Sequence, residues 1–390
     1  MTKKTRLIIL IFCVVCFFSV APILVYYSMG YRYDFAKMKI TKTGGIYVRT
    51  FPTAEEVIVD SKISVKPGFL ANDVFVQSLL PDLHTVLVKK TDYYDYYKTI
   101  LVEEERVTKL EEILLIRKDI KYAPAPKEIK SPFDAQEKFI IKTGNLYYSN
   151  SKENSGLTTT QKATPVLKKV SAFILSPFEG SPAGRPNDNI IWLGADGFLY
   201  KSDPANLTSP AIKLIETPIK IIKTGVYKII SNSQNIFVNN NGQLMLLNRG
   251  TNALENFYSP VKDAKISPDG KTIVYFNNNS IYISTIADKN ITENLLYKSP
   301  NLISDFLWLN NNYIIFTAGN KILISEIDYR GNINTVTLPQ TAVILDDPTN
   351  KTSVEKTITI KSPQIFFNSQ EGKLYILTEK TLLVSEKLVP

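Results

Sequence analysis

The chain has 390 residues, of which 44% are apolar, so it is long enough for two or three globular domains and is neither disordered nor low in complexity. Its 46 basic and 37 acidic residues leave a net charge of +9 that is spread along the chain, which gives no reason to expect a nucleic-acid partner. One histidine, His84, and two cysteines near the N-terminus, Cys13 and Cys16, exclude a multi-histidine metal site and a disulfide framework. We therefore expect no metal, no cofactor and no thiol nucleophile.

The first feature along the chain is an uncharged run of 21 residues at positions 7–27, LIILIFCVVCFFSVAPILVYY. A helix of this length spans about 30 Å, the thickness of a bilayer core. We expect it to be a transmembrane signal-anchor helix that follows a cytoplasmic basic tail over residues 1–6 and leaves the bulk of the chain extracytoplasmic. Basic residues also follow the run, so charge alone does not decide the orientation. The alternative is a cleaved signal peptide, since Ser19 and Ala21 have the spacing of a cleavage site, but Pro22 is a poor residue after a scissile bond.

Residues 43–120 alternate apolar and polar positions in short runs, which is the pattern of half-buried strands. The runs begin at Gly45, Glu56, His84, Lys98 and Val107. Prolines between the runs mark turns. The segment therefore predicts a small antiparallel β-sandwich.

The turn residues of this segment are similar to those of the PEGA domain, a small β module of bacterial and archaeal surface proteins. The residues that carry the resemblance are Gly45, Pro52–Glu55, Val57–Asp60, Leu80–Asp82, His84–Lys90 and Tyr93–Tyr94. Ser61, Asp82 and Tyr93 stand where the family pattern has glycine. The resemblance implies a surface or scaffolding module, because the family has no known catalytic centre.

A tyrosine-rich run between Asp92 and Lys98 supplies candidate binding residues. These are Tyr93, Tyr94, Tyr96 and Tyr97, whose rings could stack on the faces of a glycan. The alternative is a turn whose alternate tyrosines pack on the sheet. His84 has no cysteine or second histidine nearby, so we expect it to be a surface or capped residue and not a ligand.

Residues 121–128 read KYAPAPKE and predict an extended proline linker. A repeat of a bulky strand, a Gly or Asn turn and a second strand then recurs six times over residues 129–390. The aligned turn residues are Gly144, Gly197, Gly242, Asn279, Asn320 and Gly372. With a preceding and a following strand, each repeat has the four strands of a propeller blade. The expected fold is therefore all-β, with a six-bladed β-propeller after the sandwich.

One repeat, Ile266–Tyr275, resembles the repeat of TolB-like propellers, and the others are looser versions. We expect the ring to close without exchange between the termini. In that arrangement blade one runs from Glu128 to Val170, and blade six takes its four strands from Val354 to Leu388.

Catalytic signatures such as a nucleophile elbow, a phosphate-binding loop or a zinc-binding histidine pair do not occur in the sequence. The polar insertion 181–188 adds Arg185 and Asp188 as candidate binding residues. We expect a non-enzymatic, membrane-anchored envelope protein whose propeller binds an envelope protein or glycan. The alternative is an extracytoplasmic hydrolase or lyase acting on envelope glycans, which would need charged side chains from several blades to converge at one end of the axis.

Overall fold

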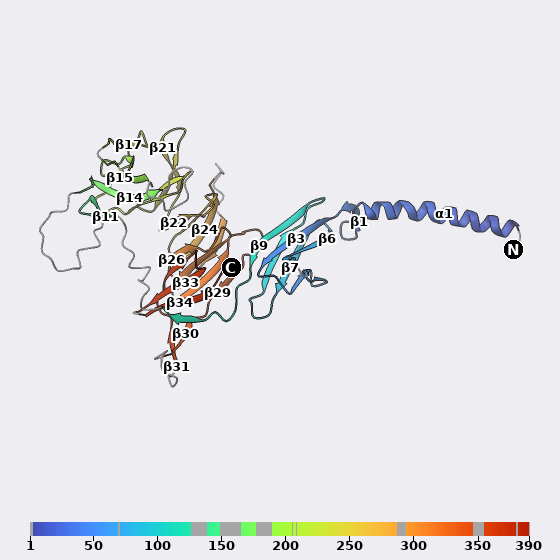
Figure 1. Ribbon diagram of the computed structural model, residues 1–390. Helices are drawn as coiled ribbons and strands as arrows, with labels where there is room; N and C mark the ends of the chain where they lie inside the picture. Colours follow the sequence, from blue (N-terminus) through green and yellow to red (C-terminus); the bar gives the residue numbers. More distant parts are fainter. Residues whose placement is uncertain are drawn as a thin grey trace. The chain divides into compact units, whose positions relative to one another are not determined.

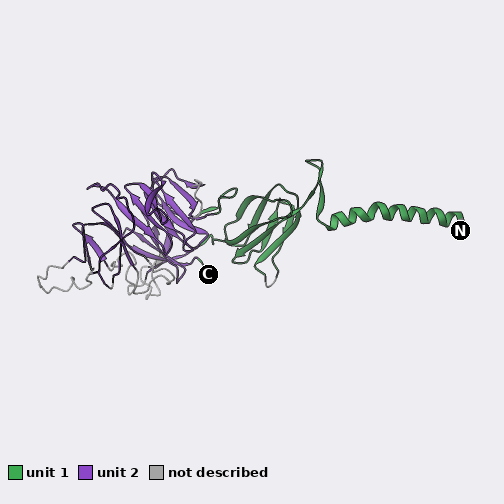
Figure 2. Cartoon of the chain, turned by 90° about the horizontal axis from the view of Figure 1, so that it is seen from above, with its two compact units in different colours: residues 1–120, 328–336, 389–390 green, residues 121–327, 337–388 purple. Residues whose placement is uncertain are grey.

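The computed structural model describes residues 3–68, 71–125, 139–148, 165–176, 189–204, 206–207, 209–286, 294–345, 355–379 and 381–389. The candidates Arg185 and Asp188 lie outside these residues, as does the strand expected near residues 129–132. The chain forms two compact units, which Figure 2 colours separately. Unit 1 comprises residues 1–120, 328–336 and 389–390, and unit 2 comprises residues 121–327 and 337–388.

The described chain begins with α1 (Lys3–Ser28), a 26-residue helix at the N-terminal end of Figure 1. Its large apolar side chains are exposed, for example Phe18 at 71%. The hydroxyls of Ser19 and Ser28 donate to backbone carbonyls of the same helix, so the uncharged stretch has few polar groups left to solvate. The helix is long and apolar enough to span a membrane or to act as a signal anchor, in agreement with the uncharged run.

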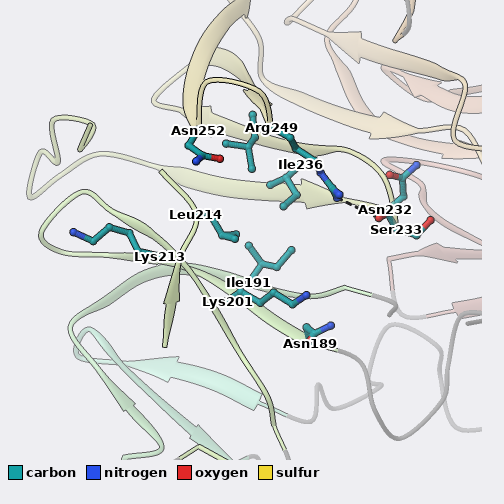
Figure 3. A pocket seen from close by; sticks show the side chains of 11 residues that line it. Asn189, Ile191, Lys201, Lys213, Leu214, Asn232, Ser233, Ile236, Arg249 and Asn252 are labelled. Atoms are coloured by element: carbon teal, nitrogen blue, oxygen red, sulfur yellow. Dashed lines mark hydrogen bonds between the residues drawn. The ribbon is translucent and has the colours of Figure 1, made fainter. Parts of the chain in front are cut away.

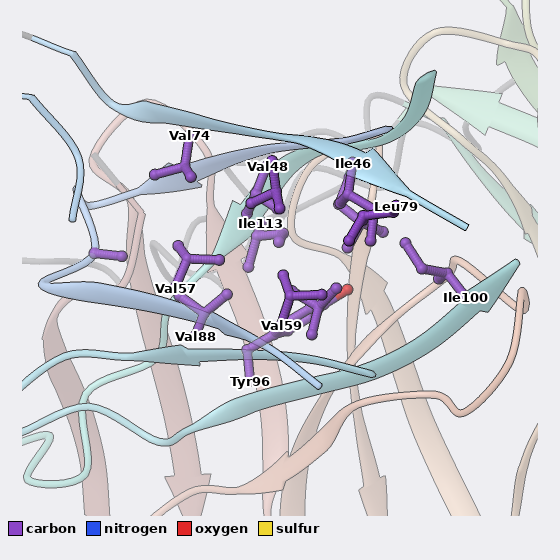
Figure 4. Close-up of a cluster of buried hydrophobic side chains, with 14 of the residues drawn as sticks. Ile46, Val48, Val57, Val59, Val74, Leu79, Val88, Tyr96, Ile100 and Ile113 are labelled. Atoms are coloured by element: carbon purple, nitrogen blue, oxygen red, sulfur yellow. The ribbon is translucent and has the colours of Figure 1, made fainter. Parts of the chain in front are cut away.

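Unit 1 contains a β-sandwich whose two sheets bury one apolar core. One sheet has the order β6 (Asp73–Leu79), β3 (Gly44–Phe51), β9 (Val107–Leu114), and the other has the order β5 (Ile63–Val65), β4 (Glu56–Val59), β7 (Leu83–Lys89), β8 (Tyr96–Leu101). Side chains at alternate strand positions meet between the sheets, as the period-two pattern predicts (Figure 4).

The expectation of a purely antiparallel sandwich is wrong at one pair of strands. β9 runs parallel to β3, with Ile46 opposite Thr108. The chain builds the whole second sheet between these two strands and then returns along the free edge of β3. Apolar alternation is the same in both kinds of pairing, so the sequence pattern could not distinguish them.

Residues 328–336 of unit 1 lie against the edge strand β8. The Asn332 side chain accepts a hydrogen bond from the Thr99 N–H at 2.8 Å and donates one to the Tyr97 carbonyl at 2.6 Å. It therefore pairs with the exposed backbone groups of β8 as a neighbouring strand would. The Lys98 side chain is completely buried, and its ammonium donates to the Asp328 carbonyl at 2.6 Å. A side chain at Gly331, whose φ is +65°, would place its Cβ 1.9 Å from the Thr99 oxygen. The segment thus covers a sheet edge that would otherwise be open.

Unit 2 is propeller-like, because its described strands form a series of small antiparallel sheets in which sequence neighbours pair. Four complete meanders are β14 (Val170–Ser176), β15 (Asn189–Gly194), β16 (Leu199–Ser202), β17 (Ile212–Lys213); β18 (Tyr227–Ser231), β19 (Ile236–Asn240), β20 (Gln243–Asn248), β21 (Ala253–Tyr258); β22 (Asp263–Ile266), β23 (Thr272–Phe276), β24 (Ser280–Thr285), β25 (Asn294–Lys298); and β26 (Ile303–Trp308), β27 (Tyr313–Ala318), β28 (Lys321–Glu326), β29 (Thr335–Thr337). A fifth sheet has the order β11 (Phe139–Lys142), β12 (Asn145–Tyr148), β13 (Leu167–Lys168).

The repeat turns behave mostly as the alignment predicts. At Gly197 φ is +84°, and a Cβ there would lie 2.0 Å from the Ile219 oxygen, so only glycine fits. In the fifth copy the residue with positive φ is Gly319, one position before the expected Asn320. Asn279 is not among the described residues with positive φ.

The expectation that the termini do not exchange strands is wrong. The last sheet has the order β32 (Gln364–Asn368), β33 (Lys373–Thr378), β34 (Thr381–Lys387), β10 (Tyr122–Pro124), so a strand from the expected linker is its outermost member. β31 (Glu355–Thr359), expected in that sheet, pairs instead with β30 (Thr341–Leu345) in a separate hairpin. Pro124 has no N–H and could not lie in a central strand, but it is compatible with an edge.

Candidate functional site

A pocket of about 260 Å³ lies where the sheet β14–β17 meets the sheet β18–β21 in unit 2 (Figure 3). Its lining residues are Asn189, Ile191, Lys201, Lys213, Leu214, Asn232, Ser233, Ile236, Leu247, Arg249 and Asn252. They come from β15, β16, β17, β19 and β20 and from the adjoining loops. The pocket is therefore built on a packed sheet interface.

The floor of the pocket is aliphatic. Ile191, Ile236 and Leu247 are each less than a tenth exposed and belong to the core that joins the two sheets. Leu214 is half-buried beside them. No aromatic ring is present among the eleven lining residues, so the floor offers apolar surface without a stacking face.

The rim of the pocket is cationic. Lys201, Lys213 and Arg249 contribute positive charge, and none of the eleven lining residues is acidic. The Lys213 ammonium lies 3.5 Å from the centre of the Phe198 ring, and in Figure 3 this side chain extends away from the other labelled residues. Lys201 and Arg249 are the two cations that lie beside the aliphatic floor.

Strand alternation places Lys201 at the pocket. It lies two residues after Leu199 in β16, on the same face of the sheet, and Leu199 is completely buried in the core between the sheets. Tyr200 points to the opposite face, where its ring stacks on Trp192 at 4.4 Å. A lysine in phase with a core leucine is the sequence signal that could have identified this site.

Asparagine turns position the other side of the pocket. The Asn248 carboxamide oxygen accepts the Gly250 N–H at 2.8 Å and shapes the turn that carries Arg249. The Asn232 oxygen accepts the N–H groups of Gln234 and Asn235 in the same way. The Arg249 guanidinium then donates to the Ser233 carbonyl at 3.3 Å, across the two loops. These contacts hold the cation over the apolar floor.

Charged side chains also converge on the first strands of three consecutive sheets. Lys265 in β22 lies within electrostatic reach of Asp263, Asp305 and Lys228. Burial lowers the pKa of the Lys265 ammonium, and the two carboxylates offset this only in part. The cluster brings charges from three consecutive sheets together, as the enzymatic alternative requires, although no observation places it at an end of the propeller axis.

The two carboxylates of this cluster are already engaged. Asp263 accepts an ion pair from Lys228 at 2.7 Å. Asp305 accepts the Ile365 N–H of β32 at 3.1 Å and so joins two sheets. Groups held in this way stabilise the packing of the sheets.

The candidate tyrosines do not share one face. Tyr96 is 5% exposed in the sandwich core, whereas its neighbour Tyr97 is 45% exposed on the opposite side of β8. Tyr93 packs partly against the core, and Tyr94 is half-buried with its N–H bonded to the Ile116 carbonyl at 2.9 Å. The structure therefore does not assemble the four rings into one exposed platform.

His84 has a structural environment. Its Nδ1 lies 2.6 Å from the Asp60 carboxylate, and its Nε2 lies 2.7 Å from the Leu80 carbonyl oxygen. Both ring nitrogens therefore have an oxygen within hydrogen-bond distance, and neither faces an open ligand site. Within the described part of the chain, no group of three or more His, Cys, Asp or Glu residues could hold a metal ion.

Comparison with known proteins does not identify this chain. No protein-family model matches the sequence, and no curated protein matches it. Among solved structures, the chain is similar to the structure of U3-55K, with 9% sequence identity and a TM-score of 0.40, and the match covers 77% of this chain and 91% of that chain. A likeness at this score carries no argument about function.

Proposed function

We propose that the chain is a single-pass, membrane-anchored cell-envelope protein whose extracytoplasmic propeller is a non-enzymatic binding scaffold. The pocket at the interface of β14–β17 and β18–β21 is the observation that carries the binding role. α1 supports the anchoring, because it carries no charge from Leu7 to Tyr27 and its large apolar side chains are exposed in the described structure. The sandwich over residues 43–120 then acts as a spacer next to the membrane.

The finer assignment of the two units is part of the proposal. Six described sheets, five of four strands and one of three, support a six-bladed propeller with TolB-like repeats. The turn between β4 and β5 supports a PEGA-like sandwich. Asp60 and Ser61 have φ values of +53° and +55° there, which is the conformation that the glycine of the family pattern favours.

The ligand of the pocket is proposed to be an acidic side chain of an envelope protein. Two cations over an aliphatic floor favour a carboxylate attached to an apolar stem. A glycan is the less favoured occupant, because sugar rings stack on aromatic faces and the lining residues provide none. The volume of about 260 Å³ suits one side chain better than a long oligosaccharide.

Photocrosslinking from the pocket rim tests this proposal. A benzophenone amino acid replaces the exposed Asn252 of the full chain, and envelopes are irradiated. We expect a protein adduct that is lost in K201A/R249A. The matched control K220A/K223A removes two exposed lysines outside the pocket lining and should keep the adduct.

Two results would contradict the proposal. An adduct that disappears after glycan digestion would identify a glycan partner. Turnover of envelope glycan by the purified chain, abolished by D263N or D305N, would favour the hydrolase or lyase alternative, since those residues hold the only carboxylates of the described inner cluster.

A further inference from the structure

A small β-hairpin follows α1 after only two residues. Its strands are β1 (Tyr31–Asp34) and β2 (Lys39–Lys42), which pair antiparallel from Tyr31–Lys42 to Asp34–Lys39. We call residues 31–42 the juxtamembrane hairpin. Side chains alternate between its two faces, and the two faces have very different surroundings.

One face of the juxtamembrane hairpin packs on the sandwich of unit 1. Asp34 and Thr41 are each 3% exposed on this face, and Thr41 donates a hydrogen bond to Glu104. Arg32 donates to the Ser78 hydroxyl at 3.3 Å, and Lys37 donates to the Pro81 carbonyl at 2.9 Å. These polar contacts fix which way the hairpin faces.

The other face carries large apolar side chains with no protein cover among the described residues. Tyr33, Phe35, Met38 and Ile40 are 42%, 81%, 72% and 68% exposed. The Tyr33 and Phe35 rings meet edge to face at 4.9 Å, and the Tyr33 hydroxyl lies 3.6 Å from the Met38 sulfur, so the four side chains form one patch. A contiguous exposed apolar patch of this kind is typical of a surface that contacts another protein or a membrane.

Contacts with the end of α1 continue this patch toward the helix. The Arg32 guanidinium lies 3.4 Å from the centre of the Tyr27 ring and donates to the Tyr27 carbonyl at 2.7 Å. The Tyr26 and Tyr31 rings meet at 5.4 Å. Tyrosine and arginine at the end of an apolar helix are typical of the membrane interface.

We propose that the juxtamembrane hairpin lies in the lipid interface, with its apolar face inserted among the headgroups and acyl chains. The inference rests on the proposed membrane anchoring of α1 and extends it to a second, β-structured contact. Lys37 and Lys39 form ion pairs with Asp82 and Glu104 at 3.2 Å and 3.7 Å, so they hold the hairpin to the sandwich and leave the apolar face free to enter the lipid. The hairpin would hold the sandwich at a set orientation above the bilayer.

Spin labels on the full chain in phosphatidylcholine and phosphatidylglycerol vesicles test this proposal. C13A leaves native Cys16 as a label site on α1, and C13A/C16A/F35C places a label at the hairpin tip. Phe35 is 81% exposed, so its replacement leaves the fold intact. The matched control is C13A/C16A/K62C, at an exposed turn of the same unit.

We expect the labels at positions 16 and 35 to be relaxed by lipid-soluble oxygen and protected from an aqueous nickel complex, and the label at position 62 to show the reverse. A water-accessible label at position 35 with a lipid-buried label at position 16 would overturn the hairpin proposal alone. Protection of position 35 from both relaxing agents would assign the patch to a protein partner instead, and would also overturn it. A water-accessible label at position 16 would overturn the anchoring and the hairpin proposal together.

Discussion

At the scale of single residues, the polar groups of unit 1 hold the sandwich in place. Burial alone would raise the pKa of Asp60, but hydrogen bonds from His84 and from the Thr85 N–H hold it below its ordinary value. Because the folded pKa is the lower one, the ionised carboxylate stabilises the fold above the unfolded pKa. This stabilisation is lost as the pH falls through the folded pKa.

The variant D60N isolates this contribution. Asparagine tolerates the φ of +53° but cannot carry the charge, so we expect a loss of about 1 kcal/mol in the free energy of unfolding at neutral pH. The difference between the wild type and D60N should shrink below a pH of about 4. Urea titration of the detergent-solubilised chain, with proteolysis of unit 1 as the readout, measures both. A difference that does not change with pH would contradict the assignment.

Lys98 supports a second prediction at this scale. Its buried ammonium lies 3.6 Å from the Asp328 carboxylate, and the pKa of Asp328, which burial would raise, is held below its ordinary value by Arg330 and Lys98. K98M should therefore cost about 3 kcal/mol, since it leaves a half-buried carboxylate with one cation fewer. The double variant K98M/D328N should recover part of this loss in the same unfolding assay. Equal stability of the two variants would show that the pair is not coupled.

The sequence anticipated some of these residues and missed others, for physical reasons. The sequence predicts His84 as a surface or capped residue because no cysteine or second histidine is near it. In the structure, however, His84 is 8% exposed and lies 2.6 Å from the Asp60 carboxylate. The sequence could not show that Lys201 and Arg249 line one pocket, because they are 48 positions apart and come together only through the packing of two sheets. The tyrosine run is a candidate binding site from its composition alone. Composition does not show that Tyr96 and Tyr97 face opposite sides of β8.

At the scale of elements, strand positions were easier to predict than strand partners. The hairpins around Gly197, Gly242 and Gly372 follow from turn chemistry and period-two burial, both of which are local. The parallel pairing of β9 and the exchange of β10 depend on contacts far apart in sequence. A proline-rich segment also looks like a linker, although an edge strand tolerates the same residues.

β10 completes the last sheet as its outermost strand, and its contribution to stability can be measured. Tyr122 is 3% exposed and lies opposite Ser385 of β34, so its ring fills the core under the last sheet. We expect Y122A to lower the free energy of unfolding of unit 2 by about 3 kcal/mol and to speed amide hydrogen exchange in β34. The control A123S changes an exposed position of the same strand and should do neither. Unchanged exchange in Y122A would show that β10 does not hold the sheet.

At the scale of the whole molecule, the chain combines an apolar N-terminal helix, a sandwich and a propeller-like unit. The uncharged run, the period-two pattern of residues 43–120 and the repeat after them were sufficient to predict this order along the chain. They do not predict the orientation of the chain across a membrane, because basic residues flank the uncharged run on both sides. The central proposal is therefore that α1 is an uncleaved anchor, with the sandwich and unit 2 on the extracytoplasmic side and residues 1–6 on the cytoplasmic side.

Cysteine labelling in spheroplasts of an expressing bacterial host tests that claim most directly. In a C13A/C16A background, K223C places a thiol at an exposed position of unit 2, and T5C places one in the basic tail. A membrane-impermeant maleimide should label K223C in intact spheroplasts and T5C only after lysis, with both variants remaining at full length in the membrane fraction. Labelling of K223C only after lysis, or release of a shortened chain from the membrane, would contradict the account.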